Sequence, residues 1–240
     1  MLEDRKEAER AYPRRIDEGS REWLRTKPFG SDPAETARLL GDFALVVALL
    51  ELRRGMSLCE LGCGPGWMTR LAVRQGVGGT GYDISPEMIE IAREQAEREG
   101  VDATFEVADM EQLDPGSRFD ACLIYDALHH TPRADLVLAS ARRVLTPAGR
   151  ILVVEPNRLH RLAAGGASEA FGTTELGYAP RRLKRLLREA GFTDLERFHA
   201  GRRRAFGDRP IDLAAHLAQP IVQRVLAPLW PQIWLRGRAA

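Results

Sequence analysis

Hydrophobic residues along the chain gather in short continuous runs, and between those runs they recur every three or four positions. The short runs predict buried strands, and the recurring pattern predicts amphipathic helices. The expected strands span residues 56–61, 77–83, 103–108, 119–125 and 149–155. Strands that alternate with helices pair in parallel, because each crossover returns the chain to the same edge of the sheet. We therefore expect an α/β fold with a doubly wound, mostly parallel sheet and helices on both faces.

Residues that start and stop helices agree with this pattern. Asp32, Pro33 and Glu35 form a helix start, with an acid that caps the first turn and a proline at the first helical position. Ser85 caps a second helix, and Gly100 ends it. The expected helices span residues 32–52, 67–75, 85–100, 132–145 and 179–190, and an outer strand follows at 192–198.

The first strand leads directly into a glycine-rich turn. Gly62, Gly64 and Gly66 stand at alternate positions, and a helix start follows them. Glycine permits left-handed backbone angles and lets a ligand approach the main chain. The unpaired N–H groups at the start of the next helix add polar donors. Because the third glycine comes one position early for the dinucleotide pattern, the turn predicts a ligand site but fits nicotinamide binding poorly.

Acidic residues stand at or near the ends of the expected strands. Each one alone is equally well explained as a helix cap or a loop carboxylate. The carboxyl ends of parallel strands, however, meet at one edge of the sheet, where ligands of such folds bind. A cluster of carboxylates there disfavours a pyrophosphate and favours a ligand that carries a cation and hydroxyl groups. The acids are Glu60, Asp83, Asp109, Asp126 and Glu155.

Two stretches carry a family resemblance. Glu60-Leu-Gly62-Cys-Gly64-Pro-Gly66 resembles the first motif of class I S-adenosylmethionine (SAM) methyltransferases, and residues 126–130, Asp-Ala-Leu-His-His, resemble a stretch after the fourth strand in their small-molecule group. The resemblance covers roughly residues 34–198. It implies the Rossmann-like class I methyltransferase fold, with S-adenosyl-L-methionine as cofactor.

The resemblance also implies roles for single residues. The glycine turn would approach the methionyl and ribose parts of SAM, and Glu60 would hold its amino-acid end. Asp83 would accept the two ribose hydroxyls, and Asp109 would accept the adenine amino group, roles that suit carboxylates. The expected cofactor-binding residues are Glu60, Gly62, Cys63, Gly64, Gly66, Asp83, Ile84, Met88, Asp109, Met110 and Tyr125.

His129 and His130 are the candidate catalytic residues. They lie where the acceptor pocket of the resembling family opens, and histidine titrates near neutral pH, so either one could take a proton from a hydroxyl acceptor. The alternative is that they shape the pocket wall or cap the following helix. Residues 125–128, Tyr-Asp-Ala-Leu, depart from the N/D-P-P-Y/F motif of enzymes that methylate planar amino groups, which disfavours bases and amides as acceptors.

Length and composition narrow the class of protein. A chain of 240 residues fits one large domain. A net charge of +1 gives no general attraction to nucleic acid or membranes. The three cysteines fit neither a disulfide framework nor a metal site, and the charged N-terminus is not a signal peptide, so we expect a cytoplasmic protein without a bound metal. The longest apolar run, residues 43–50, is too short to span a membrane.

The expected organisation is a central domain with appended segments. Residues 1–31 form a cap or lid, or alternatively a surface arm, and residues 32–200 form the SAM-binding domain. Residues 157–178 read as a mobile loop or insertion near the acceptor pocket. Residues 201–240 read as a basic extension that packs on the domain, with helix-like apolar spacing at 221–234. That last stretch could instead touch a membrane surface, or a second subunit in a homodimer.

These observations lead to one principal hypothesis of function and two alternatives. We expect a SAM-dependent methyltransferase that acts on a small molecule, at oxygen rather than at nitrogen or carbon. An RNA or polyanion methyltransferase would use a basic surface for phosphates, whereas an ordinary solvated helix face explains the same residues. A SAM-binding module without catalysis is the other alternative. The basic residues are Arg181, Arg182, Lys184, Arg185 and those at 202–204.

Overall fold

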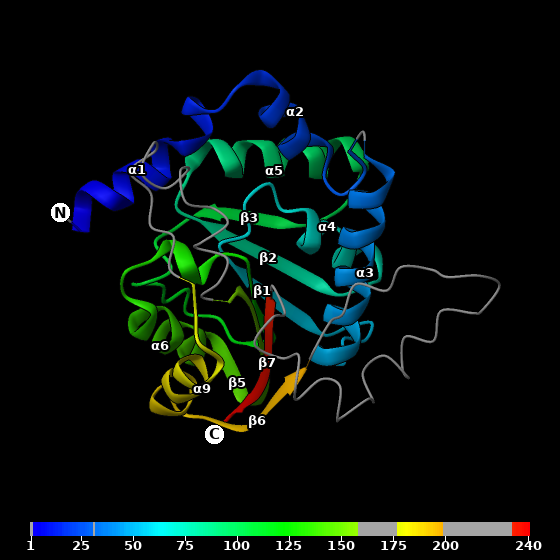
Figure 1. Ribbon diagram of the computed structural model, residues 1–240. Helices are drawn as coiled ribbons and strands as arrows, with labels where there is room; N and C mark the ends of the chain where they lie inside the picture. The colour runs from blue at the N-terminus through cyan, green and yellow to red at the C-terminus, as the bar shows by residue number, and fades with distance from the viewer. Residues whose placement is uncertain (1, 31, 158–176, 199–231) are drawn as a thin grey trace, which may run out of the picture.

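A seven-stranded sheet runs through the middle of the molecule (Figure 1). The computed structural model describes residues 2–30, 32–157, 177–198 and 232–240. The strand order is β3-β2-β1-β4-β5-β7-β6, in which β7 runs antiparallel to both neighbours and the other pairs are parallel. This confirms the expected doubly wound, mostly parallel sheet. The strands are β1 Ser57–Leu61, β2 Gly78–Asp83, β3 Thr104–Val107, β4 Phe119–Tyr125, β5 Leu145–Pro156, β6 Phe192–Phe198 and β7 Gln232–Ala239.

Helices cover both faces of the sheet. α3 and α4 pack on one face and α6 and α9 on the other, while α5 covers β2 and β3 (Figure 1). The N-terminal α1 and α2 lie beside α5. The helices are α1 Leu2–Arg15, α2 Glu18–Thr26, α3 Pro33–Leu50, α4 Trp67–Arg74, α5 Pro86–Glu99, α6 Ala134–Val144 and α9 Pro180–Glu189, with a short 3-10 helix, η1, at Leu128–His130.

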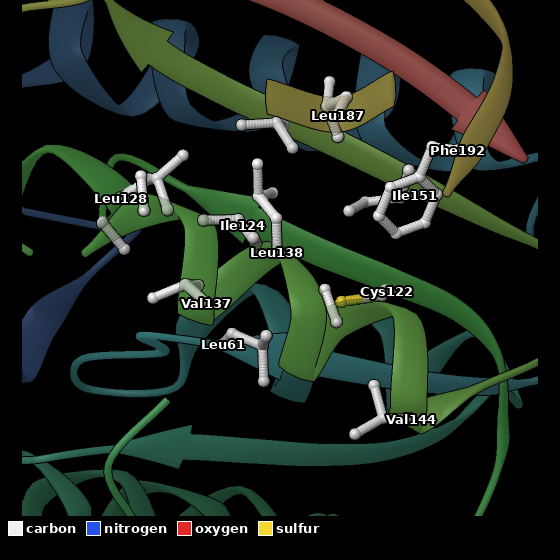
Figure 2. Close-up of a cluster of buried hydrophobic side chains, with 14 of the residues drawn as sticks. Leu61, Cys122, Ile124, Leu128, Val137, Leu138, Val144, Ile151, Leu187 and Phe192 are labelled. Carbon is white, nitrogen blue, oxygen red and sulfur yellow. The ribbon is translucent and has the colours of Figure 1, made fainter. Parts of the chain in front are cut away.

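The core is divided by the sheet into two apolar layers. Figure 2 shows the layer under α6 and α9, where Leu138 and Leu187 meet Ile124 and Ile151 from the central strands. In the other layer, residues of α3 and α4 pack on alternate positions of the same strands. Because every central strand is covered on both faces, its side chains are nearly all apolar, as the continuous runs in the sequence indicated.

The C-terminal end corrects one expectation. Residues 232–239 are not part of an extension packed on the domain, because they form β7, hydrogen-bonded between β5 and β6. Ile233 and Leu235 face one apolar layer and Trp234 faces the other. A short strand buried on both faces resembles a helical segment in its apolar pattern, which explains the misreading. The rest of the predicted extension and most of the predicted loop at 157–178 lie outside the described residues.

The N-terminal segment is largely helical. α1 and α2 account for most of residues 2–26, and Asp17 caps α2 by accepting a hydrogen bond from the Ser20 amide at 2.9 Å. Across the described ranges, no helix combines the length and the apolar character needed to cross a bilayer.

Candidate active site

The glycine turn between β1 and α4 forms the floor of the site. Gly62, Gly64 and Gly66 have φ angles of 71°, 51° and 69°, all in the left-handed region that favours glycine. A Cβ on Gly62 would come within 2.4 Å of the Ala127 Cβ, so the chain at the end of β4 passes too close for a side chain. A Cβ on Gly64 would meet nothing within 4 Å, and Gly64 lines a cavity.

Gly66 differs from the other two glycines in its surroundings. It does not line the cavity, and a Cβ there would lie 2.4 Å from the Phe105 ring and 2.9 Å from Ala92. The absence of a side chain at Gly66 therefore lets α4 start close to β3 and α5. The spacing of the glycines alone does not reveal this difference.

A cavity of about 440 Å³ opens above the turn, at the carboxyl ends of the parallel strands. Its wall combines residues of the strand ends with residues of the N-terminal helices. Apart from Gly66, all the predicted cofactor and catalytic residues line it, namely Glu60, Gly62, Cys63, Gly64, Asp83, Ile84, Met88, Asp109, Met110, Tyr125, His129 and His130. Asp126 also lines it, but Glu155 does not, so four of the five strand-end acids meet there.

Asp83 is held in place by the backbone. One carboxylate oxygen accepts the Gly64 amide at 2.8 Å and the other accepts the Ser85 amide at 2.9 Å. Burial raises the pKa of Asp83, while these two hydrogen bonds oppose the rise. The carboxylate thus sits at a fixed position beside the bare turn, as a diol-binding acid requires.

Glu60 lies deeper, at the end of β1. Burial raises its pKa to about 7, although the Thr69 hydroxyl and the Thr69 amide, the latter at 3.1 Å, donate hydrogen bonds to it. A buried carboxylate of this kind is stabilised in its charged form when a cation binds beside it.

Asp109 already has a cationic partner. Its Oδ1 accepts the Glu111 amide at 2.9 Å, and its Oδ2 accepts Lys6 Nζ of α1 at 2.6 Å. The same ammonium lies 2.7 Å from Glu111 Oε2. Burial disfavours the charge of Lys6, but the two carboxylates outweigh burial and raise the pKa of Lys6. α1 therefore lies directly over the acid expected to meet adenine.

His129 is oriented by the buried Glu155. Glu155 Oε1 accepts the amides of Ala127 and Leu128 at 3.1 and 2.7 Å, and Oε2 accepts the His129 amide at 3.1 Å. Oε2 also lies 2.8 Å from His129 Nδ1. A carboxylate that already takes three backbone N–H groups acts as an acceptor, so Nδ1 donates and the basic lone pair of the neutral ring is on Nε2. Glu155 thus positions the histidine instead of contacting a ligand.

The other candidates at the end of β4 have separate surroundings. The ring centroids of His130 and His129 lie 4.0 Å apart, and His130 Nδ1 lies 3.4 Å from Glu9 Oε1 of α1. The Tyr125 hydroxyl donates to Asp42 Oδ2 at 2.6 Å. Burial, with Asp42 beside it, raises the pKa of Tyr125 well above its usual range, so Tyr125 is a neutral wall residue.

Sequence reasoning missed the cavity residues that come from the N-terminal helices. Lys6, Glu9 and Tyr12 of α1, and Trp23 and Lys27 at α2, all line the cavity. They belong to no motif, and only the charged, aromatic character of the segment marked it as a cover. Their position depends on packing against α5, to which no local sequence pattern points.

The residues present fit an adenosine-containing cation. The site offers a bare backbone turn, a backbone-held carboxylate for a diol, a buried acid for an ammonium and a part-buried acid for an amine. The position beyond Gly64 is open, so a ligand can lie against the main chain there.

The comparisons with known proteins identify the family. A sequence model described as a methyltransferase domain matches residues 52–191. The chain is 30% identical over 156 residues to a ubiquinone biosynthesis O-methyltransferase of Paramagnetospirillum magneticum, covering 61% of this chain and 63% of that protein. It is 32% identical over 139 residues to a demethylmenaquinone methyltransferase of Tropheryma whipplei, covering 58% of this chain and 56% of that protein. The matches thus span less than two thirds of these relatives.

Solved structures share the fold. Magnesium protoporphyrin IX methyltransferase of Synechocystis PCC 6803, with bound S-adenosylhomocysteine (SAH), has a TM-score of 0.69 at 16% identity and covers 99% of this chain and 100% of its own. Phosphoethanolamine N-methyltransferase 2 of Haemonchus contortus, in complex with SAM, has a TM-score of 0.68 at 15% identity and covers 97% of this chain and 60% of its own. The family match covers more than half of the chain, so the protein belongs to the methyltransferase domain family, the class I methyltransferases that use S-adenosyl-L-methionine.

Proposed function

We propose that the protein transfers the methyl group of SAM to an oxygen atom of a small organic acceptor. The observation that carries this proposal is the shared cavity, which has the acid-lined glycine turn at its floor and a histidine of fixed tautomer in its wall. Among the relatives, the Paramagnetospirillum protein is named as an O-methyltransferase, as is the 27-O-demethylrifamycin SV methyltransferase of Amycolatopsis mediterranei, 37% identical over 44% of this chain and 40% of that protein.

The chain's own residues would bind and align the reactants. SAM supplies a methyl group on a sulfonium that leaves readily, so the protein mainly has to position the acceptor and exclude water. Glu60 would hold the cofactor's ammonium, Asp83 its ribose hydroxyls, and Asp109 its adenine amine.

His129 would serve as the general base. Bound SAM would supply the methyl group, and its sulfur would keep the electron pair of the broken carbon–sulfur bond. His129 Nε2 would accept the proton that the acceptor hydroxyl loses when its oxygen is methylated. Glu155 supports this by holding Nδ1–H at 2.8 Å, which also stabilises the imidazolium that results. His130, beside Glu9 of α1, would shape the acceptor side of the pocket.

We also propose that α1 and α2 are the lid of this site. Lys6 of α1 contacts Asp109 and Glu111 of the rim, and Arg14 pairs with Glu87 at the start of α5. These side-chain ion pairs can break and re-form, so the cofactor can enter without a change in the sheet. The free, buried cysteines accord with the cytoplasmic location that we propose.

Labelled SAM tests the proposal directly. We would incubate the protein with methyl-labelled SAM and a panel of catechols, hydroquinones, primary amines and short RNA, because two relatives are named for ubiquinone and demethylmenaquinone. Label in a methyl ether of a phenol is the expected result. Tight SAH binding with no transfer to any acceptor would instead favour a SAM-binding module, and transfer to RNA alone would favour the polyanion alternative.

The helix bearing the basic residues gives the polyanion alternative no support. α9 packs on the sheet through the buried Leu183 and Leu187, and Arg181, Arg182 and Arg185 are exposed on its outer face. This is the ordinary arrangement of a solvated amphipathic helix. The basic residues at 202–204 lie outside the described residues.

A further inference from the structure

Lys27 is a cation in the cavity wall, at the end of α2. It follows the last residue of α2, and its Nζ lies 3.5 Å from the centroid of the Trp23 ring. Its carbonyl oxygen accepts Nη2 of the buried Arg70 at 3.1 Å, and Arg70 belongs to α4. The backbone of Lys27 is thus anchored to the helix that follows the glycine turn, while its side chain lines the cavity.

The charge of Lys27 has no ion-pair partner among the described residues. The nearby Glu35 and Asp42 both pair with Arg38, at 2.8 and 3.1 Å. Asp126 attracts Lys27 only from beyond ion-pair distance. Lys6 makes the contrast plain, because in the same cavity it holds two carboxylates at 2.6 and 2.7 Å.

The ammonium of Lys27 is therefore only partly compensated. Burial lowers its pKa to about 8, against the attraction of Asp126 and Glu35. With a pKa of about 8, roughly nine tenths of the lysine is charged at pH 7. A neighbouring aromatic ring stabilises a cation less than a hydrogen-bonded anion does. At neutral pH the wall thus presents a mostly charged donor with three N–H groups and no acceptor.

We propose that Lys27 is the binding partner of a carboxylate group held in the cavity. The proposal rests on the function proposed above, because it assigns a group within the same site. Two molecules of that reaction can carry the carboxylate, namely the methionyl end of the cofactor and an acidic acceptor. Lys27 is the cavity-lining cation that lacks a carboxylate partner in the described part of the chain, so it can pair with either without breaking an existing ion pair.

Two matched ligand pairs distinguish these sources. The first is SAM against decarboxylated SAM, which keeps the sulfonium and the amine and lacks only the carboxylate. The second is 3,4-dihydroxybenzoate against 3,4-dihydroxybenzamide, bound to the SAH-loaded protein. Calorimetry with wild type, Lys27→Met and Lys27→Arg would give the dissociation constants, and circular dichroism melting would confirm that the variants fold.

The expected result is a selective loss in one pair. Lys27→Met should weaken the carboxylate member about tenfold to a hundredfold, the range for a charged hydrogen bond, and change the other member less than twofold. Lys27→Arg should retain most of the affinity. For wild type, binding of that carboxylate should weaken as the pH rises through about 8, where Lys27 loses its charge, and Lys27→Arg should not show this dependence.

The contrary results are equally clear. If Lys27→Met discriminates between the members of neither pair, or weakens both members equally, the assignment of Lys27 is wrong. If wild type binds neither SAM nor decarboxylated SAM, the proposed function itself fails. If wild type binds SAM but no more tightly than Lys27→Met does, only the pairing of Lys27 with the cofactor carboxylate is refuted.

Discussion

The rim of the sheet and the N-terminal cap build the same cavity by different means. At the rim, backbone N–H groups hold the acids, as Gly64 and Ser85 hold Asp83 at 2.8 and 2.9 Å. In the N-terminal cap, which α1 and α2 form, long side chains reach acids on the rim of the sheet, as Lys6 reaches Asp109 at 2.6 Å. Hydrogen bonds to neighbouring backbone are fixed once the strand and turn form, whereas side-chain ion pairs between elements can break separately.

This difference separates two tasks. Binding a common cofactor requires only a fixed rim, and a local turn sequence can encode it. Admitting reactants and choosing an acceptor require a part that can move and vary. We therefore assign cofactor affinity to the rim, and ligand exchange and acceptor choice to the cap, and variants of each should separate these effects.

The largest expected effect is on turnover. His129→Asn keeps a donor for Glu155 but removes the basic nitrogen, so kcat should fall about 10²- to 10⁴-fold, the range for a lost general base. SAH affinity should change less than threefold, because the histidine belongs to the acceptor side. Turnover with the best phenol of the panel, together with SAH calorimetry, measures both quantities. An unchanged kcat would show that His129 is not the general base and only shapes the pocket wall.

The second effect is a difference between Gly66 and Gly64, one in stability and the other in cofactor binding. Gly66→Ala forces a Cβ into Phe105 at a left-handed φ of 69°, and overpacking with backbone strain should cost about 3 kcal/mol of unfolding free energy. Gly64→Ala meets open space, so it should cost only about 1 kcal/mol of strain and should mainly weaken SAH binding. Denaturant unfolding and calorimetry measure the two variants. Equal stability losses would show that we have misassigned the two glycines.

The third effect is a pH dependence of cofactor affinity. Burial raises the pKa of Glu60 to about 7, so a falling pH protonates Glu60 in the free protein and removes the charge that would meet the cofactor's ammonium. SAH affinity should fall as the pH drops below 7, approaching about tenfold per pH unit. Glu60→Gln should bind more weakly at pH 8 and lose most of this dependence. A wild-type affinity that is flat from pH 5.5 to 7.5 would contradict the role of Glu60.

The smallest effect concerns the cap. Lys6→Met removes the ion pair over Asp109, so SAH should both enter and leave a few-fold faster, with less change in affinity. The pair is part-buried, which makes its contribution modest. Arg10→Met is the matched control, because the Arg10 side chain pairs with Glu3 and Glu7 within α1. Stopped-flow binding should give wild-type rates for Arg10→Met. Wild-type rates for Lys6→Met as well would refute the proposal that the Lys6 ion pair helps to hold the lid closed.

The same contrast explains what the sequence could predict. The strands, the glycine turn and the acids Glu60, Asp83 and Asp109 depend on neighbouring residues, and the structure brings them to one cavity. Lys6 and Lys27 reach the cavity only because distant helices pack on α5, which no local pattern encodes. Glu155 was one of the five acids expected at the strand ends, but its carboxylate accepts backbone amides and orients His129 instead of lining the cavity.

The sequence did not predict the strand at residues 232–239, for a related reason. Its apolar residues are covered on both faces of the sheet, so the alternation that marks a half-buried strand is missing. Its place between β5 and β6 is also set by pairing with residues about 35 to 90 positions earlier in the chain. Long-range pairing of this kind leaves no signal in a short window of sequence.

Calorimetric titration of SAH into wild type, Asp83→Asn and the surface control Asp102→Asn tests the central claim most directly. The account predicts measurable binding to wild type, unchanged binding to Asp102→Asn, and at least about a tenfold loss for Asp83→Asn, the size of one charged hydrogen bond. Absence of SAH binding to folded wild type, or equal affinity of wild type and Asp83→Asn, would contradict the claim that the carboxyl edge of the sheet holds the cofactor.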